Sequence, residues 1–94
     1  MRIPVTMYQA ADSAALKTGV RRGHVLREWI GKWAARKVLV DYHALRGTKQ
    51  VSMVLDEEAQ QYLDGEAARL EVETGRTWSR AAVIRALWAQ ERSR

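Results

Sequence analysis

The feature that most constrains the fold is a short strand with one apolar face in the second half of the chain. Across residues 48–55, apolar Val51, Met53 and Leu55 alternate with residues that face the opposite way. Alternation with a period of two predicts a strand that buries one face. Because a lone strand of this kind leaves its backbone groups unpaired, it needs a partner strand.

Two helices are predicted after this strand. Asp56 is a candidate N-cap, and apolar residues then recur at helical spacing as far as Thr74 and Gly75, a suitable helix stop. Ser79 is the next candidate cap. The apolar face of the second helix then consists of Val83, Ile84, Leu87 and Trp88.

The first half repeats this order in a shorter form. Val5 and Met7 alternate with the polar or exposed positions around them, which predicts a strand that ends near Tyr8. A brief helix is expected from about residue 10 to residue 17, with Thr18-Gly19 as its stop. A further helix carries an i, i+3, i+4, i+7 stripe formed by Leu26, Trp29, Ile30 and Trp33.

The two halves can be laid over one another. Val5-Thr6-Met7 matches Val51-Ser52-Met53 at an offset of 46, and Val25-Leu26-Arg27 matches Val83-Ile84-Arg85 at an offset of 58. A longer first helix in the second half absorbs the difference between the offsets. The match predicts a duplicated unit: residues 1–35 form the first unit, 36–47 the connection and 48–94 the second unit.

The predicted fold is mainly α-helical, with a two-stranded antiparallel β-ribbon and an approximate twofold axis between two units of one chain. The two strands pair, and their four helices interlock beneath the ribbon. A chain of 94 residues is long enough for one such core and too short for two independent ones.

The charge distribution points to a polyanionic partner. The net charge is +5; residues 1–49 contain ten Lys or Arg against three acids, whereas residues 50–94 contain six against eight. This polarity suits a protein with one face toward a polyanion, although a salt-bridged helical surface explains it equally well.

A surface ribbon has the width of the DNA major groove and can present side chains to base edges. Lys49 lies beside the ribbon, where a phosphate is within its reach. The residues predicted to face outward are Arg2, Pro4, Thr6 and Tyr8 on one strand and Gln50, Ser52 and Val54 on the other. All except Pro4 are candidate base contacts.

The second half resembles the ribbon-helix-helix superfamily of DNA-binding proteins. The resemblance rests on KQVSMVLDEEAQQYL followed by TGRTWSRAAVIRALW and covers about 46 residues well and the first half loosely. Val54, Tyr8 and Gln9 depart from the residues common in that superfamily. Most members are short homodimers, so the tandem arrangement implies a monomeric pseudodimer.

The resemblance also implies which residues hold phosphates. In that superfamily the N-terminus of each unit's second helix binds one, and free N–H groups and the helix dipole favour an anion there. The matching residues are Arg22, Gly23 and His24 in the first unit and Thr77, Ser79 and Arg80 in the second.

The function expected from this resemblance is binding of double-stranded DNA, in an accessory role in plasmid or T-DNA processing and transfer in bacteria. Other DNA-processing or transfer proteins are then candidate partners. A transcriptional repressor or antitoxin of the same fold is an alternative. A helical protein-interaction adaptor that binds no nucleic acid is another, and an exchanged dimer competes with the monomer.

Other classes find little support in the sequence. There is no cysteine, no metal-ligand spacing and no phosphate-binding glycine loop, so we expect neither an enzyme nor a cofactor. No apolar run is long enough for a membrane span, and we expect a cytoplasmic protein without a membrane partner. Trp29, Trp33 and Trp88 are expected in the core rather than stacked on bases, whereas Trp78 falls in a turn.

Overall fold

The computed structural model describes residues 1–39 and 47–92. In this part of the chain, four helices accompany a two-stranded antiparallel sheet, which confirms the mainly α-helical class with a β-ribbon. The elements in chain order are β1 Arg2–Pro4, α1 Val5–Thr18, α2 Arg22–Trp33, β2 Thr48–Gln50, α3 Glu57–Thr74 and α4 Arg80–Arg92.

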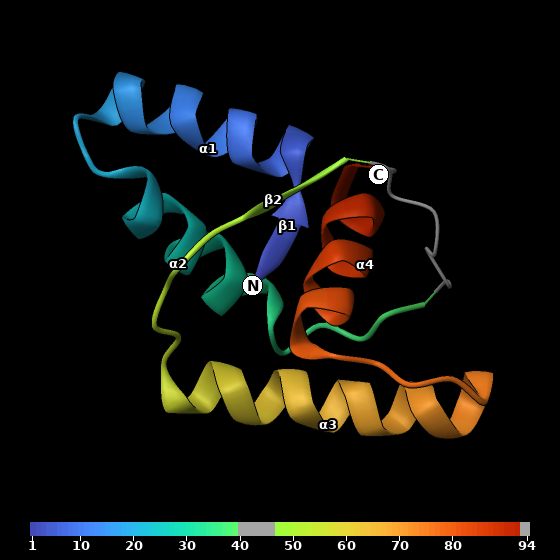
Figure 1. Ribbon diagram of the computed structural model, residues 1–94. Helices are drawn as coiled ribbons and strands as arrows, with labels where there is room; N and C mark the ends of the chain where they lie inside the picture. The colour runs from blue at the N-terminus through green and yellow to red at the C-terminus, as the bar shows by residue number, and fades with distance from the viewer. Residues whose placement is uncertain (40–46, 93–94) are drawn as a thin grey trace.

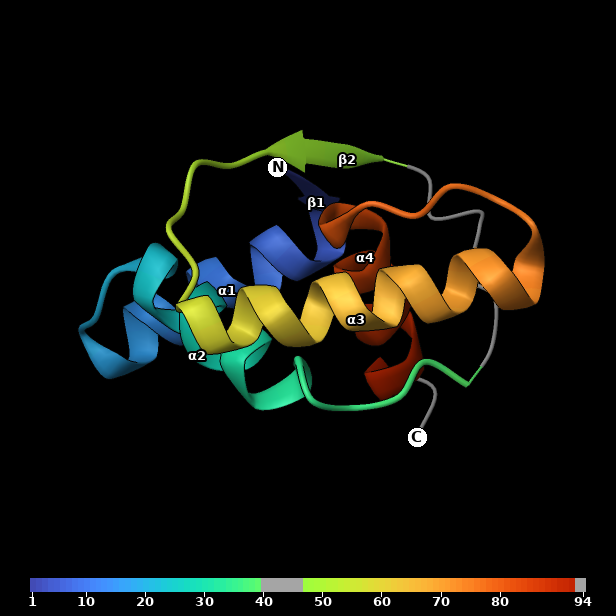
Figure 2. The same ribbon diagram turned by 90° about the horizontal axis from the view of Figure 1, so that it is seen from below.

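The two strands of the ribbon are far apart in the sequence. Arg2 pairs with Gln50, Ile3 with Lys49 and Pro4 with Thr48. One further residue on each strand continues the pairing, because the Val51 N–H donates to the Met1 carbonyl over 2.8 Å. Seen from below, β2 forms one edge of the molecule and the helices lie beneath it (Figure 2). The ribbon is therefore a surface feature, as the sequence predicts.

The first strand is shorter than the sequence predicts. Val5, Thr6, Met7 and Tyr8 belong to α1, so the strand prediction for these residues is wrong. The alternation there spans only a few residues, and Met7 with Ala11 also fits a helical i, i+4 stripe; both side chains are fully buried. Four alanines between residues 10 and 15 favour a helix strongly. Pro4 suits the position just before this helix, because proline has no backbone N–H that would need a partner there.

The second strand keeps its predicted faces but not its predicted length. The pairing runs from Pro4 and Thr48 at one end to Met1 and Val51 at the other. Because α1 begins at Val5, β1 contributes no residue beyond Pro4 to the ribbon. The segment that follows remains alternately buried: Val51 and Met53 are partly buried and Leu55 is buried, while Ser52 and Val54 are exposed. The one-faced pattern is thus confirmed for residues 50–55.

The predicted helix boundaries in the second half are confirmed. Gly75 ends α3 in the left-handed region with φ 71°, and Gly19 ends α1 in the same way with φ 73°. The Ser79 hydroxyl accepts the Ala82 N–H at 3.1 Å, so it caps α4. Asp56 occupies the N-cap position of α3 but its side chain makes no capping hydrogen bond.

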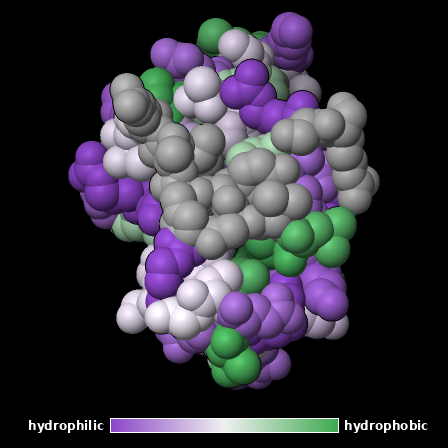
Figure 3. Space-filling model, turned by 90° about the vertical axis from the view of Figure 1, so that its right-hand side faces the viewer, coloured by the Kyte–Doolittle hydropathy of each residue, from purple (hydrophilic) through white to green (hydrophobic). Residues whose placement is uncertain are grey.

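The core draws buried side chains from β1 and from all four helices. Trp29 stacks on Trp33 and on Trp88 with ring centroids 5.9 Å apart in each pair. Trp33 and Trp88 are buried and Trp29 is partly buried, which confirms their expected core placement. Trp78, in the turn before α4, is also buried. On the face that Figure 3 shows, hydrophilic side chains dominate and the hydrophobic ones gather in separate patches.

Between α2 and β2, the described part of the connection is bound by side chains of the second half. Glu66 accepts the Val38 N–H at 2.8 Å and Arg69 donates to the Val38 carbonyl at 2.8 Å. Gln90 accepts the Leu39 N–H and donates to the Lys37 carbonyl. Residues 37–39 are therefore extended and docked on α3 and α4. The remainder of the expected connection, residues 40–46, lies outside the described residues.

Candidate nucleic-acid interface

The exposed face of the ribbon carries polar side chains from both strands. Arg2 and Gln50 are paired in register and both are exposed. The Arg2 Nε donates to Thr48 Oγ1 across the ribbon at 2.8 Å. Ser52 and Val54 continue the same exposed face beyond the strand. Four of the six predicted base contacts, Arg2, Gln50, Ser52 and Val54, are thus accessible on one side.

The other two predicted base contacts are not on the ribbon. Thr6 lies in the first turn of α1, where its hydroxyl accepts the Trp88 Nε1–H at 2.9 Å. Tyr8 is also helical, and its ring lies 4.1 Å from the Arg22 guanidinium carbon and 4.5 Å from Lys49 Nζ. Both placements on the ribbon were wrong because α1 begins at Val5. Pro4, also expected to face outward, is buried.

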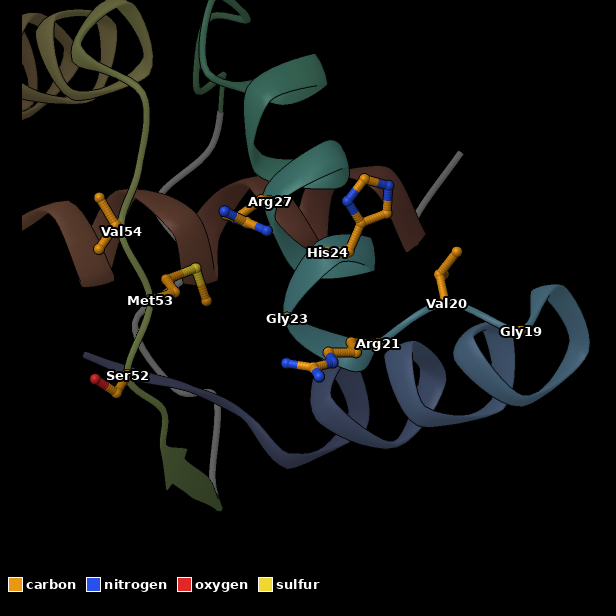
Figure 4. A pocket seen from close by; sticks show the side chains of 9 residues that line it. All are labelled: Gly19, Val20, Arg21, Gly23, His24, Arg27, Ser52, Met53 and Val54. Atoms are coloured by element: carbon orange, nitrogen blue, oxygen red, sulfur yellow. The ribbon is translucent and has the colours of Figure 1, made fainter.

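A groove separates the start of α2 from the segment that follows β2. Its larger hollow, of about 690 Å³, is lined on one side by the turn before α2 and the first turns of α2, and on the other by residues 52–54 (Figure 4). A second hollow of about 310 Å³ shares Gly23, Ser52 and Met53 with it and reaches Gln50 and Tyr8. We call the two together the α2–β2 groove.

The α2–β2 groove is lined by basic side chains. Arg21, His24 and Arg27 come from the start of α2, and Figure 4 shows Arg21 and Arg27 extending toward residues 52–54 while His24 points away. No carboxylate in the described part of the chain pairs with Arg21 or Arg27. The first turn of α2 contains no acidic residue, and its N-cap, Arg21, makes no side-chain capping bond. An anion at this helix start would therefore meet positive charge and free N–H groups.

Two of the predicted phosphate contacts in this region have internal partners. Arg22 Nη1 binds Asp12 Oδ1 at 2.7 Å, and this hydrogen bond raises the pKa of the guanidinium. His24 Nε2 lies 3.0 Å from Glu28 Oε1, one helical turn away. Arg22 and Lys49 are both held against the Tyr8 ring, which contributes about 0.5–1 kcal/mol for each exposed cation. Arg22 also lines the smaller hollow of the groove.

The predicted phosphate contacts of the second unit lie at the start of α4, and none of them lines the α2–β2 groove. Arg80 donates to both carboxylate oxygens of Asp64, at 2.7 and 2.8 Å, and this bond lowers the pKa of Asp64. The Trp78 N–H donates to Glu71 at 3.1 Å, and the Ser79 hydroxyl is engaged in capping. Thr77 is exposed beside them. Carboxylates of α3 therefore already neutralise this helix start.

The sequence did not single out Arg21, Arg27 or Thr48. Arg27 follows His24 by three residues in α2, but the two side chains point different ways at the groove, so this spacing was no signal for Arg27. Thr48 shares the strand face of Gln50 and Ser52 through the period of two. The exposed position of Arg21 depends on where α2 begins, which the sequence did not define.

Comparison with protein-family models, with curated proteins and with solved structures finds no match to this chain. Among the described residues, no three potential ligating side chains lie close enough together to hold a metal ion. None of the helices in the described part combines the length and the apolar character that a membrane crossing requires.

Proposed function

We propose that this chain binds duplex DNA, with the exposed face of the ribbon in the major groove and the cations of the α2–β2 groove on the phosphate backbone. The observation that carries the proposal is the adjacency of two kinds of side chain. Arg21 and Arg27, without a described carboxylate partner, face the segment that carries exposed Gln50 and Ser52. Phosphate binding and base contact are thus available on one surface.

The proposed reader residues are Arg2, Gln50, Ser52 and Val54. A glutamine amide can bond to adenine, an arginine to guanine, and valine can contact a thymine methyl group. Because the two strands present different residues, the preferred site is not a palindrome. Thr6 and Tyr8 are left out of this proposal since both belong to α1.

We further propose that the chain is a tandem ribbon-helix-helix protein, a monomeric pseudodimer with two related units. Three observations support an approximate twofold relation. α1 packs on α2 and α3 packs on α4. Val25-Leu26 and Val83-Ile84 are buried at matching places in α2 and α4. Ile3 pairs directly with Lys49, 46 positions away, which is the offset at which the sequence of residues 5–7 matches that of residues 51–53, although residues 5–7 belong to α1.

A DNA-binding test with a salt series distinguishes this proposal from the adaptor alternative. We expect the anisotropy of a labelled duplex to rise with protein, and the affinity to fall log-linearly with salt. Gln50→Ala and Ser52→Ala should then reduce the preference between duplexes of different sequence without changing the salt slope. Absence of binding at low salt, from protein that is folded by circular dichroism, would refute the DNA proposal.

For the biological process we propose two alternatives. An accessory role in plasmid or T-DNA transfer, and a repressor or antitoxin role, would use the same surface. Sequence selectivity separates them: a repressor needs strong preference for one site, whereas an accessory factor tolerates a modest one. Selection of bound sequences from a random duplex pool would measure that preference.

A further inference from the structure

The outward side of α3 is a second exposed surface, away from the ribbon. Residues at helical spacing along this side, Gln61, Gly65, Ala68 and Val72, are all exposed, and Val72 is 86% exposed. Seen from below, α3 crosses the front of the molecule without any described segment covering it (Figure 2). We call these four residues and the acids beside them the α3 face.

The α3 face is acidic. Residues 56–66 contain five acids and no Lys or Arg, of which Asp64 is bound by Arg80 and Glu66 by Arg69. The three acids of residues 56–58 have no partner among the described side chains. Glu57 and Glu58 are exposed in the first turn of the helix. A hollow of about 190 Å³ beside them is lined by Asp56, Glu58 and Tyr62 from the second half and by small residues of the first half. A partner that fits this face would bring positive charge and a modest apolar surface.

The end of α1 on the opposite side of the molecule has those properties. Leu16 is 86% exposed and Val20 is 40% exposed, although both are apolar. Arg22 in this region is bound to Asp12 and Arg21 lines the α2–β2 groove, so the positive charge at the end of α1 itself comes from the exposed Lys17. We call Leu16, Lys17 and Val20 the α1 end.

Gly65 adds a reason to expect close approach by another chain. A glycine inside an exposed helix costs about 1 kcal/mol relative to alanine. The fold of this chain does not require a glycine at position 65, because a Cβ there would meet no atom within 4 Å. The absent side chain leaves room on the outside of the helix, where an apolar side chain such as Leu16 would fit.

We propose that the α3 face of one copy binds the α1 end of a second copy. Charge complementarity supports this choice of partner, because acids without a described partner on one side would meet the positive charge of Lys17 on the other. The two surfaces differ and lie on opposite sides, α1 at the top and α3 at the bottom of Figure 1. Such a contact is heterologous, so it joins copies head to tail and leaves the ribbon between the two surfaces uncovered.

Sedimentation velocity of the protein alone tests this proposal without DNA. At low salt, the average mass is expected to rise above 10.7 kDa as the protein concentration increases, and to return toward it at high salt. Lys17→Glu and Glu58→Lys should each abolish the rise. Lys32→Glu, an equal reversal of an exposed charge on α2, should leave it unchanged.

Mixing the two variants gives the decisive measurement. Lys17→Glu protein keeps an intact α3 face and Glu58→Lys protein keeps an intact α1 end, so one contact can form between them. The mixture should regain the rise in mass above 10.7 kDa with concentration, because this contact forms and the reversed charges on the two altered surfaces are also opposite in sign. A parent that stays at 10.7 kDa at millimolar concentration, or a mixture that stays monomeric, overturns the proposal.

Discussion

Removal of Arg21 and Arg27 together tests whether the α2–β2 groove holds the phosphate backbone. Both side chains line or cap the groove, both are exposed, and no described carboxylate pairs with either. Changing both to glutamine therefore removes two charges without disturbing the core. A control with Lys17→Gln and Lys32→Gln removes two exposed charges of the same sign away from the groove.

The expected size of the effect follows from counterion release. Each phosphate contact on B-form DNA contributes about −0.9 to the slope of log K against log salt. The loss of two contacts should therefore make the slope shallower by about 1.8. Extrapolated from 1 M salt, where this contribution vanishes, the affinity at 0.1 M should fall about 60-fold. Anisotropy titrations at four or more salt concentrations would measure both quantities.

The control decides whether this is a local or a general charge effect. The Lys17 and Lys32 double variant should lose only a few-fold in affinity, because distant charges act through screened solvent. If both double variants lower the slope equally, the groove is not the phosphate site. If the Arg21 and Arg27 double variant keeps the parent slope, the reasoning about the start of α2 is refuted.

Three further predictions concern stability. Gly75→Ala should destabilise the protein by about 1 kcal/mol, because φ is 71° there. Gly65→Ala should stabilise it by up to about 1 kcal/mol, because alanine favours a helix and its Cβ has room. Urea denaturation measures both changes in the free energy of unfolding, and changes of the same sign would contradict these two conformational roles. The Arg69 guanidinium lowers the pKa of Glu66, so this carboxylate stabilises the fold above the ordinary glutamate pKa of about 4.3, and that stability is lost as the pH falls through the lowered value. Glu66→Gln should therefore weaken the pH dependence of unfolding in that acid range, and an unchanged acid transition would count against the pair. Trp88→Ala should cost about 3–5 kcal/mol through loss of the stacked cluster and of its bond to α1, and a loss below 1 kcal/mol would contradict its place in the core.

Local patterns were sufficient where one periodicity ran for many residues. The stripes of α3 and α4 and the left-handed stops at Gly19 and Gly75 follow from side-chain spacing and from the conformational freedom of glycine. The buried and exposed faces of residues 50–55 follow from a period of two. These features depend on neighbours within one or two turns, so the sequence alone determines them.

Local patterns failed where two periodicities fitted the same few residues. Met7 is buried in a strand with Val5 or in a helix with Ala11, and packing against the rest of the core selected the helix. That choice shortened the ribbon and moved Thr6 and Tyr8 from its surface into α1. The length of a strand depends on its partner, which lies some 46 residues away in this chain.

For the candidate site, too, the sequence determined some features and the tertiary structure others. The sequence identified the charged and polar residue types, with Arg22, His24, Gln50 and Ser52 among them. Only the tertiary structure brought α2 beside residues 52–54, left Arg21 and Arg27 without a described carboxylate partner, and paired Arg80 with Asp64. Residue type and helical spacing are local properties, whereas the availability of a charge depends on which distant carboxylate the fold brings within reach.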